Sequence, residues 1–173
     1  HRICLEIPGD ASGNPFSTPA LASGLLGELY FVMGRFDEAL AIELETLEPL
    51  RSSIGERSKR VGVALHSIGN TLHKQGKYEE ALARLDEAQS ILTETSGAED
   101  SYVAAVLTSK GNCLTTLRRN DEARAMHEEA LRIGRIADGD GSIQVAASLH
   151  NLGYILSETG MLSEARANYE EAL

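Results

Sequence analysis

The chain has 173 residues, which is enough for one domain, and its formal net charge is −10 at pH 7. Because a field of this sign repels phosphate backbones and anionic lipid headgroups, it argues against nucleic acids and membrane surfaces as partners. No apolar run approaches the ~20 residues of a membrane-spanning helix, and Cys4 and Cys113 are too far apart in the sequence to indicate a disulfide framework or a metal site, so we expect a reducing, cytoplasmic compartment.

A period of 42 residues organises the whole chain. A fixed period in this range is typical of stacked structural repeats, each of which buries its apolar face only against its neighbours. We therefore predict four repeats, over about 18–58, 59–100, 101–142 and 143–173, with the last one truncated. One glycine and one alanine recur in every copy, as Gly27, Gly69, Gly111 and Gly153 and as Ala39, Ala81, Ala123 and Ala165.

Residues 1–17 have two possible interpretations. Three of the chain's four prolines lie within residues 1–19, as expected for a linker. The period indicates instead the tail of a preceding repeat, because counting back in steps of 42 places Cys4 at the small-residue position of Ala88 and Leu5 at the position of Leu47. On that interpretation, His1–Ile7 is the last part of a second helix.

Each repeat is predicted to form two antiparallel helices. In the first helix, apolar residues recur at helical spacing, as at Leu65, Ile68 and Leu72. The second helix opens with an acidic first turn, which suits the positive end of the helix dipole. We expect the first helices over about 18–33, 59–75, 101–117 and 143–159, and the ends of the second helices near 53, 95 and 136.

Local signals mark the helix ends and one close helix contact. Asp100 and Ser142 are predicted N-caps. A left-handed residue is expected where three of the first helices end, at Gly34, Gly76 and Gly160. The glycine that leads each copy lies inside the first helix, where glycine costs roughly 1 kcal/mol relative to alanine. Because this cost recurs in every repeat, we expect a neighbouring helix to pass where the Cβ atom would lie.

The combined pattern resembles the tetratricopeptide repeat, in the 42-residue form found in kinesin light chains. Asn151-Leu152-Gly153, Gly160 and Glu164-Ala165 carry the resemblance most clearly in the fourth repeat. It covers about residues 18–173, and it implies an all-α, right-handed α-solenoid, or superhelix, of antiparallel helix pairs. The third repeat departs from the family pattern at Lys110, Arg118 and Asn120, so we expect this copy to be the least stable junction or a bend.

The resemblance also implies that the first helices line a concave groove. Residues at spacings of three, four and seven share one helix face, and amides, hydroxyls and imidazoles on that face suit the backbone of an extended peptide. The alternative is an ordinary solvated helix face. In the first repeat Leu25, Phe31 and Val32 make this face apolar, as an anchor pocket or a contact with a preceding repeat. The candidate groove residues are His66, Asn70, His73, Lys74, Thr108, Asn112, Thr115, His150, Asn151 and Tyr154.

No cofactor, metal site or catalytic residue is predicted. His66 and His73 are seven residues apart, whereas a helical zinc pair is typically separated by four residues and needs further ligands. The run Asp138–Ser142 resembles the start of a calcium loop, but Ile143 stands where that loop needs glycine. Cys113 is expected in the core rather than as a nucleophile.

The sequence therefore predicts a non-enzymatic protein–protein interaction scaffold, whose concave groove binds a peptide or partner segment. Two alternatives remain open. The array could be the sensor or regulatory domain of a larger signalling protein, such as a nucleotide-binding switch ATPase. It could also be a self-assembling structural array, whose ends associate with other copies.

Overall fold

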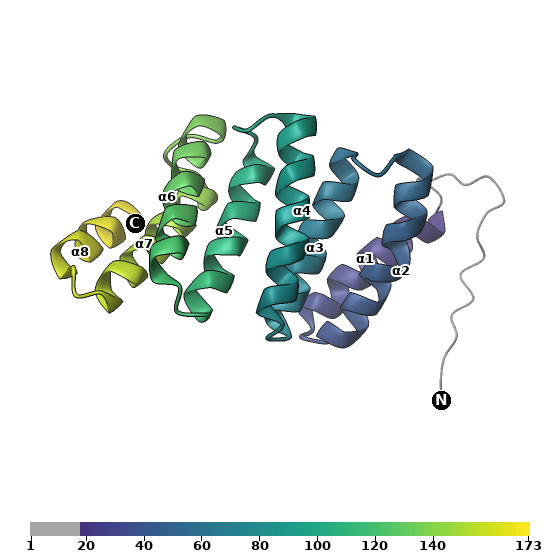
Figure 1. Ribbon diagram of the computed structural model, residues 1–173, viewed down its shortest axis with the longest axis horizontal. Coiled ribbons are helices and arrows are strands. Elements are labelled where there is room, and N and C mark those ends of the chain that lie inside the picture. Colours follow the sequence, from purple (N-terminus) through teal and green to yellow (C-terminus); the bar gives the residue numbers. More distant parts are fainter. Residues whose placement is uncertain (1–17) are drawn as a thin grey trace.

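The computed structural model describes the backbone of residues 18–173 and the side chains from Ser23 onward, so both interpretations of residues 1–17 lie outside it. Every regular element in this described part is an α-helix (Figure 1). The first helices of the four repeats are α1 (Thr18–Val32), α3 (Lys59–Lys74), α5 (Ser101–Thr116) and α7 (Ile143–Glu158). The second helices are α2 (Phe36–Ile54), α4 (Tyr78–Ser96), α6 (Asn120–Ala137) and α8 (Leu162–Glu171).

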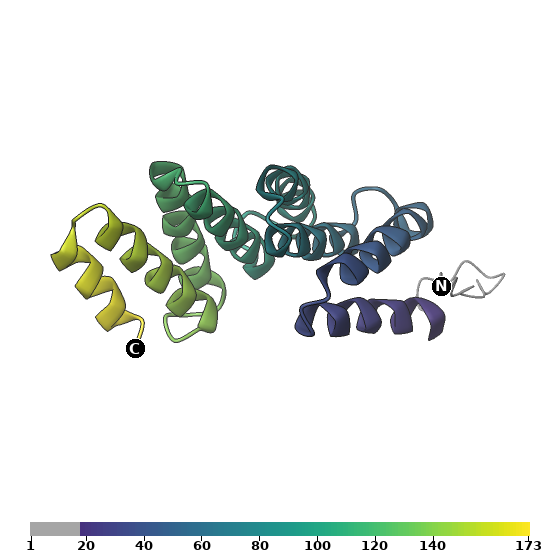
Figure 2. The same cartoon turned by 90° about the horizontal axis from the view of Figure 1, so that it is seen from below.

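The helices stack as pairs in the order of the sequence, and Figure 2 shows that the pairs change direction along the row, so that the row coils. Each helix packs mainly on its neighbours in sequence, and α3 also contacts α5, as α5 contacts α7. Between successive second helices of the described chain there is no comparable backbone contact, so the first helices lie closer together. The prediction of an all-α solenoid of antiparallel helix pairs is confirmed.

The leading glycines lie where the two helices of a repeat approach most closely. A Cβ atom added to Gly69 would lie 2.7 Å from the side chain of Leu85, and one added to Gly111 would lie 2.5 Å from the ring of His127. Gly153 meets Tyr169 in the same way. The predicted steric demand is confirmed in these three repeats. Gly27 differs, because its nearest neighbour would be 3.6 Å away, which is ordinary van der Waals contact.

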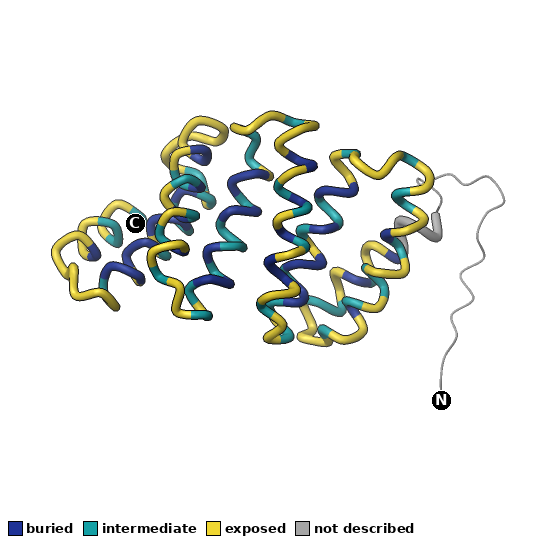
Figure 3. Tube along the Cα trace, in the orientation of Figure 1, coloured by how far each residue is buried: buried dark blue, intermediate teal, exposed yellow. Residues whose placement is uncertain are grey.

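The core runs continuously through the row between the paired helices (Figure 3). The predicted alanines Ala39, Ala81, Ala123 and Ala165 are all buried. Leu65, Leu85 and Ile91 are among the largest side chains with almost no exposed surface. Each of them removes apolar area from water at about 25 cal/mol per Å², and this burial holds the pairs together because aromatic side chains are few.

Side chains cap three of the first helices. The predicted caps Asp100 and Ser142 accept hydrogen bonds from the backbone N–H groups of Tyr102 and Val145. Ser58 caps α3 in the same way, a cap that the sequence analysis did not identify. The expected left-handed conformation is also confirmed, with positive φ angles at Gly34, Gly76 and Gly160. In the third repeat Arg118 takes this conformation, with φ of 58°, and it is the one non-glycine residue of the described chain that does so.

The junction between the second and third repeats replaces an apolar contact with a polar one. Lys110 extends from α5 to α4, where its Nζ atom lies 2.6 Å from Asp86 Oδ1 and 2.8 Å from Gln89 Oε1. One repeat earlier, the positions of Gln89 and Lys110 are occupied by Leu47 and Ile68, which are both buried. The departure at Lys110 is therefore matched by partners on the neighbouring helix, and whether this junction is the least stable one stays a prediction.

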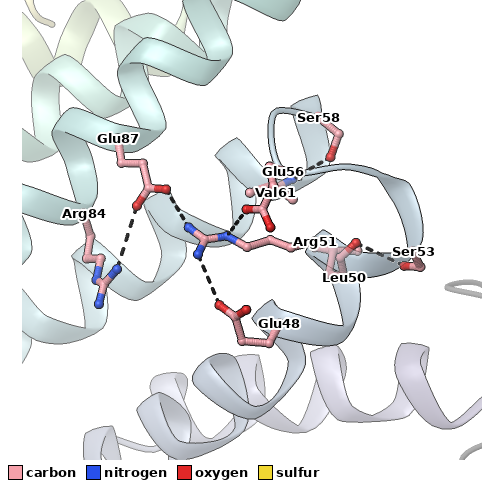
Figure 4. A network of polar contacts seen from close by, with 9 residues as sticks. All are labelled: Glu48, Leu50, Arg51, Ser53, Glu56, Ser58, Val61, Arg84 and Glu87. Atoms are coloured by element: carbon pink, nitrogen blue, oxygen red, sulfur yellow. Dashed lines mark hydrogen bonds and ion pairs between the residues drawn. The ribbon is translucent and has the colours of Figure 1, made fainter.

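Arginine–glutamate pairs connect the second helices on the other side of the row. Arg51 of α2 reaches Glu87 of α4 at 2.5 Å and also contacts Glu48 and Glu56 (Figure 4). The Arg51 side chain is only 15% exposed, so water screens these contacts less than it screens a typical surface pair. The contact recurs further along the array, where Arg135 of α6 pairs with Glu171 of α8.

Two ionisable side chains occupy the position that faces the leading glycines. Glu43 and His127 stand where the other repeats have Leu85 and Tyr169. Burial raises the pKa of Glu43 to about 7, although a hydrogen bond with Thr71 acts in the opposite direction. Burial lowers the pKa of His127 to about 4, and neither ring nitrogen of this fully buried side chain has a hydrogen-bond partner. At neutral pH the histidine is therefore uncharged.

Arg118→Gly is expected to stabilise the protein by about 1 kcal/mol, because glycine adopts a positive φ angle without the clash between a Cβ atom and the backbone. Urea denaturation followed by circular dichroism measures the change. The reverse substitution at the equivalent turn, Gly76→Arg, is the matched control and is expected to destabilise. A lower free energy of unfolding for Arg118→Gly would contradict the prediction.

The free energy of unfolding is expected to depend on pH through Glu43 and His127, with opposite signs. Unfolded histidine takes up a proton near pH 6.5, whereas folded His127 does so only near pH 4, so its contribution is complete above pH 6.5 and lost as the pH falls. The pKa difference corresponds to on the order of 3 kcal/mol. Unfolded glutamate ionises near pH 4.5, so the contribution of Glu43 is complete below that pH and lost as the pH rises through about 7.

Two variants separate these effects in urea denaturation between pH 4 and 8. His127→Leu should remove the loss of stability on the acid side, because a leucine fills the same position in the second repeat without titrating. Glu43→Gln should remove the loss toward pH 8. If His127→Leu retained the full wild-type dependence between pH 6.5 and 4, the assignment of that dependence to His127 would be wrong.

Candidate functional site

The candidate groove residues lie along α3, α5 and α7, which contact one another in the row. Each of these helices repeats the same pattern, because the leading glycine turns one face toward the paired second helix and leaves the next face to the groove. Lys74, His150 and Tyr154 are exposed. The other candidates are half-buried, namely His66, Asn70, His73, Thr108, Asn112, Thr115 and Asn151.

Hydrogen bonds between polar side chains connect the three helices. His66 Nε2 of α3 lies 2.9 Å from Ser109 Oγ of α5. Asn151 Nδ2 of α7 donates to Asn112 Oδ1 of α5 at 3.0 Å. We call the side chains in these contacts the polar row, together with Thr108, whose Oγ1 accepts from Gln144 Nε2 at 2.5 Å, and Asn70, whose amide lies 3.2 Å from His66 Nε2.

The polar row includes one residue that the sequence analysis did not identify. Gln144 stands at the start of α7, where it also donates to the carbonyl oxygen of Ala104. Its equivalents in the second and third repeats are Arg60 and Tyr102, so the period gives no chemical signal at this position. The sequence placed Asn70 and Asn112 at equivalent positions, but Asn112 bonds to the fourth repeat and Asn70 bonds within its own helix.

His66 acts as an uncharged hydrogen-bonding group. Burial lowers its pKa to about 4, so the ring is neutral at pH 7. With its proton on Nδ1, the ring accepts at Nε2 from the Ser109 hydroxyl and the Asn70 amide. In a catalytic triad the third residue holds the opposite ring nitrogen, and the histidine must be basic enough to take the serine proton. Neither condition is met here, so the contact joins two helices and does not activate Ser109.

Three candidates are engaged within their own repeats. The ring of His73 packs on Tyr78 at a centroid distance of 5.5 Å, and both burial and the charge of Lys74 lower its pKa. The ring of His150 packs on Tyr169 at the same distance. The hydroxyl of Thr115 donates to the carbonyl oxygen of Gly111. These side chains therefore have fewer free hydrogen-bonding groups for a ligand than the sequence suggests.

The first repeat presents an apolar continuation of the same face. Leu25 and Val32 are 68% and 77% exposed, so both are available to a ligand. Phe31 instead packs edge-on against Phe36 of its own second helix, which is the contact that His73 and Tyr78 make one repeat later. The face thus changes from apolar on α1 to amide and hydroxyl groups on α5, with Lys74 as a cation between them.

Other chemistry finds little support in the described residues. No group of three or more histidine, cysteine or acidic side chains there is arranged to hold a metal ion. Cys113 is buried as expected, and burial raises the pKa of its thiol to about 11, so it stays protonated at neutral pH. An open hollow of about 730 Å³ lies between the inter-repeat loops, but its Arg132 is already paired with Glu99 and Glu129. Within residues 18–173, no helix is both long and apolar enough to cross a membrane.

Comparison with known proteins identifies the repeat. BtubC (BKLC) from P. vanneervenii matches 89% of this chain with a TM-score of 0.79 and 24% identity, and this chain spans 62% of that protein. A Rap protein complexed with competence and sporulation factor matches 87% with a TM-score of 0.74 and 17% identity, and this chain spans 41% of it. At these identities the likeness shows the fold. No curated protein matches the chain.

A family model adds evidence from the sequence itself. The model described as tetratricopeptide repeat matches residues 18–99 and 102–173, and so covers both halves of the array. Repeats of this kind generally mediate protein–protein interactions and are usually non-catalytic. The resemblance recognised in the 42-residue period is confirmed, and the chain belongs to the tetratricopeptide repeat family.

Proposed function

We propose that the groove along α3, α5 and α7 binds an extended peptide or a segment of a partner protein, and that it does so without catalysing a reaction. The observation that carries this proposal is the polar row itself. Half-buried amide and hydroxyl groups follow one another across three repeats, and they are connected by hydrogen bonds that fix their positions. Fixed groups lose less side-chain entropy when a ligand binds.

The chemistry of the row suits a peptide backbone. An extended peptide presents alternating N–H and C=O groups, and an asparagine amide offers both a donor and an acceptor to such groups. Asn112 uses its carbonyl oxygen to hold Asn151, which leaves its N–H₂ group to donate to a ligand. Next to this row, Lys74 favours an acidic side chain, while Leu25 and Val32 offer apolar surface. A solved Rap protein of the same fold is described in complex with a factor, which supports binding as a use of this fold.

A direct binding experiment tests the proposal. Peptides selected from a random library against the chain are expected to lose about tenfold or more in affinity for the double variant Asn70→Ala plus Asn112→Ala, because each hydrogen bond from an amide contributes about 1 kcal/mol. Isothermal titration calorimetry measures the dissociation constants. Asn168→Ala on α8 is the matched control, since that asparagine lies outside the groove, and it should leave the affinity unchanged. Equal affinities for the double variant and the wild type would exclude these side chains from the binding site.

A second candidate function is end-to-end self-association. Exposed apolar side chains at the two ends of the array favour it, among them Leu29 and Met33 on α1 and Leu162 on α8. Sedimentation velocity over a wide range of concentrations should then show mass increasing with concentration, and Leu162→Glu should abolish the increase. A monomer at every concentration would count against self-association while leaving the groove proposal intact.

A regulatory role in a larger signalling protein, such as a nucleotide-binding switch ATPase, would use the same groove. In that case, peptide binding would change the activity of the attached domain. Measuring nucleotide hydrolysis by the full-length protein with and without a selected peptide separates this role from simple scaffolding.

A further inference from the structure

The face of α1 that carries Leu29 lacks the cover that its equivalents have in the other three repeats. Leu29 is 52% exposed, whereas the side chains at the same repeat position, Thr71, Cys113 and Ile155, are exposed by at most 3%. Met33, one helical turn further along, is also exposed. Its counterpart Gln75 is half-buried. The repeat therefore defines this face as one that is normally buried.

The contacts in the later repeats show which element covers this face. Thr71 of α3 hydrogen-bonds to Glu43 of α2, and Gln75 of α3 donates to the carbonyl oxygen of Phe36. One repeat later, Lys110 of α5 bonds to Gln89 of α4. In each case the covering element is the second helix of the preceding repeat. The face on α1 thus has the shape and composition that fit such a helix.

The repeat period assigns partners to this face. Counting back 42 residues from the Gln89–Lys110 and Leu47–Ile68 positions pairs Leu5 with Leu26, and counting back from Glu43 and Thr71 pairs His1 with Leu29. We propose that His1–Ile7 docks on the Leu26 and Leu29 face of α1, as the end of a second helix of repeat type. This inference does not depend on what the groove binds.

The residue types fit this arrangement. Leu47 and Ile68, and Leu131 and Leu152, hold the equivalent positions at two of the three junctions, and Leu5 with Leu26 would be a third apolar pair of the same kind. A seven-residue helix is not stable alone in water, so its order would depend on packing against α1. Glu6 falls at the position of Glu48, which is exposed on α2, so its side chain should point to solvent.

A tryptophan reporter tests the docking, because the chain contains no tryptophan of its own. In the full chain, Leu29→Trp should emit at shorter wavelength and be quenched less by acrylamide than the same reporter combined with Leu5→Asp. Glu6→Ala is the matched control and should leave both readings unchanged. If the shielding of the reporter disappears on dilution, a second copy covers the face and the proposal is wrong.

Hydrogen–deuterium exchange provides a second test that leaves Leu29 in place. Leu5→Asp should speed amide exchange in α1 several-fold and leave α7 unchanged, while circular dichroism confirms that the array remains helical. If exchange in α1 is the same with and without Leu5→Asp, the proposal is overturned, whatever the tryptophan reports.

Discussion

The close approach of two helices within each repeat is the contact on which the rest of the structure depends. At Gly69, Gly111 and Gly153, a Cβ atom would come within 3 Å of a side chain on the paired helix. A larger residue would push the pair apart, and the displacement would pass to the next repeat, because the second helix of one repeat forms the surface on which the next first helix packs. The loose contact at Gly27 lies in the first repeat, where Glu43 rather than leucine stands at the facing position.

The groove follows from this packing. Since the second helices make no comparable backbone contact with one another in the described chain, the first helices come together, and their polar side chains meet across repeat boundaries. Hydrogen bonds then join α3 to α5 and α5 to α7. On the second helices, long arginine side chains span a wider gap to glutamates, as Arg51 does to Glu87. The two sides therefore use different chemistry for the same purpose, which is to fix each repeat relative to the next.

The sequence predicted the repeats, the helix bounds to within one residue and the caps Asp100 and Ser142, because each of these leaves a local or periodic signal. It could not predict the pairing of polar side chains. The bonded pairs His66–Ser109 and Asn112–Asn151 are separated by 43 and 39 residues rather than by the 42 of the period. Contacts between positions that are not equivalent depend on the tilt between helices, and a periodic pattern does not contain that tilt.

By itself, the sequence determined that this protein is a row of helix pairs, because a small residue at a fixed step and apolar residues at helical spacing permit no other packing of the chain. The tertiary structure alone decided which of the candidate groove residues remain free for a ligand, since His73 and His150 pack on tyrosines while Asn70 and Asn112 stay on the open face. It also decided the charge states of Glu43 and His127. Both results depend on how far neighbouring helices exclude water from a side chain, and that is a property of the assembled array rather than of any one segment.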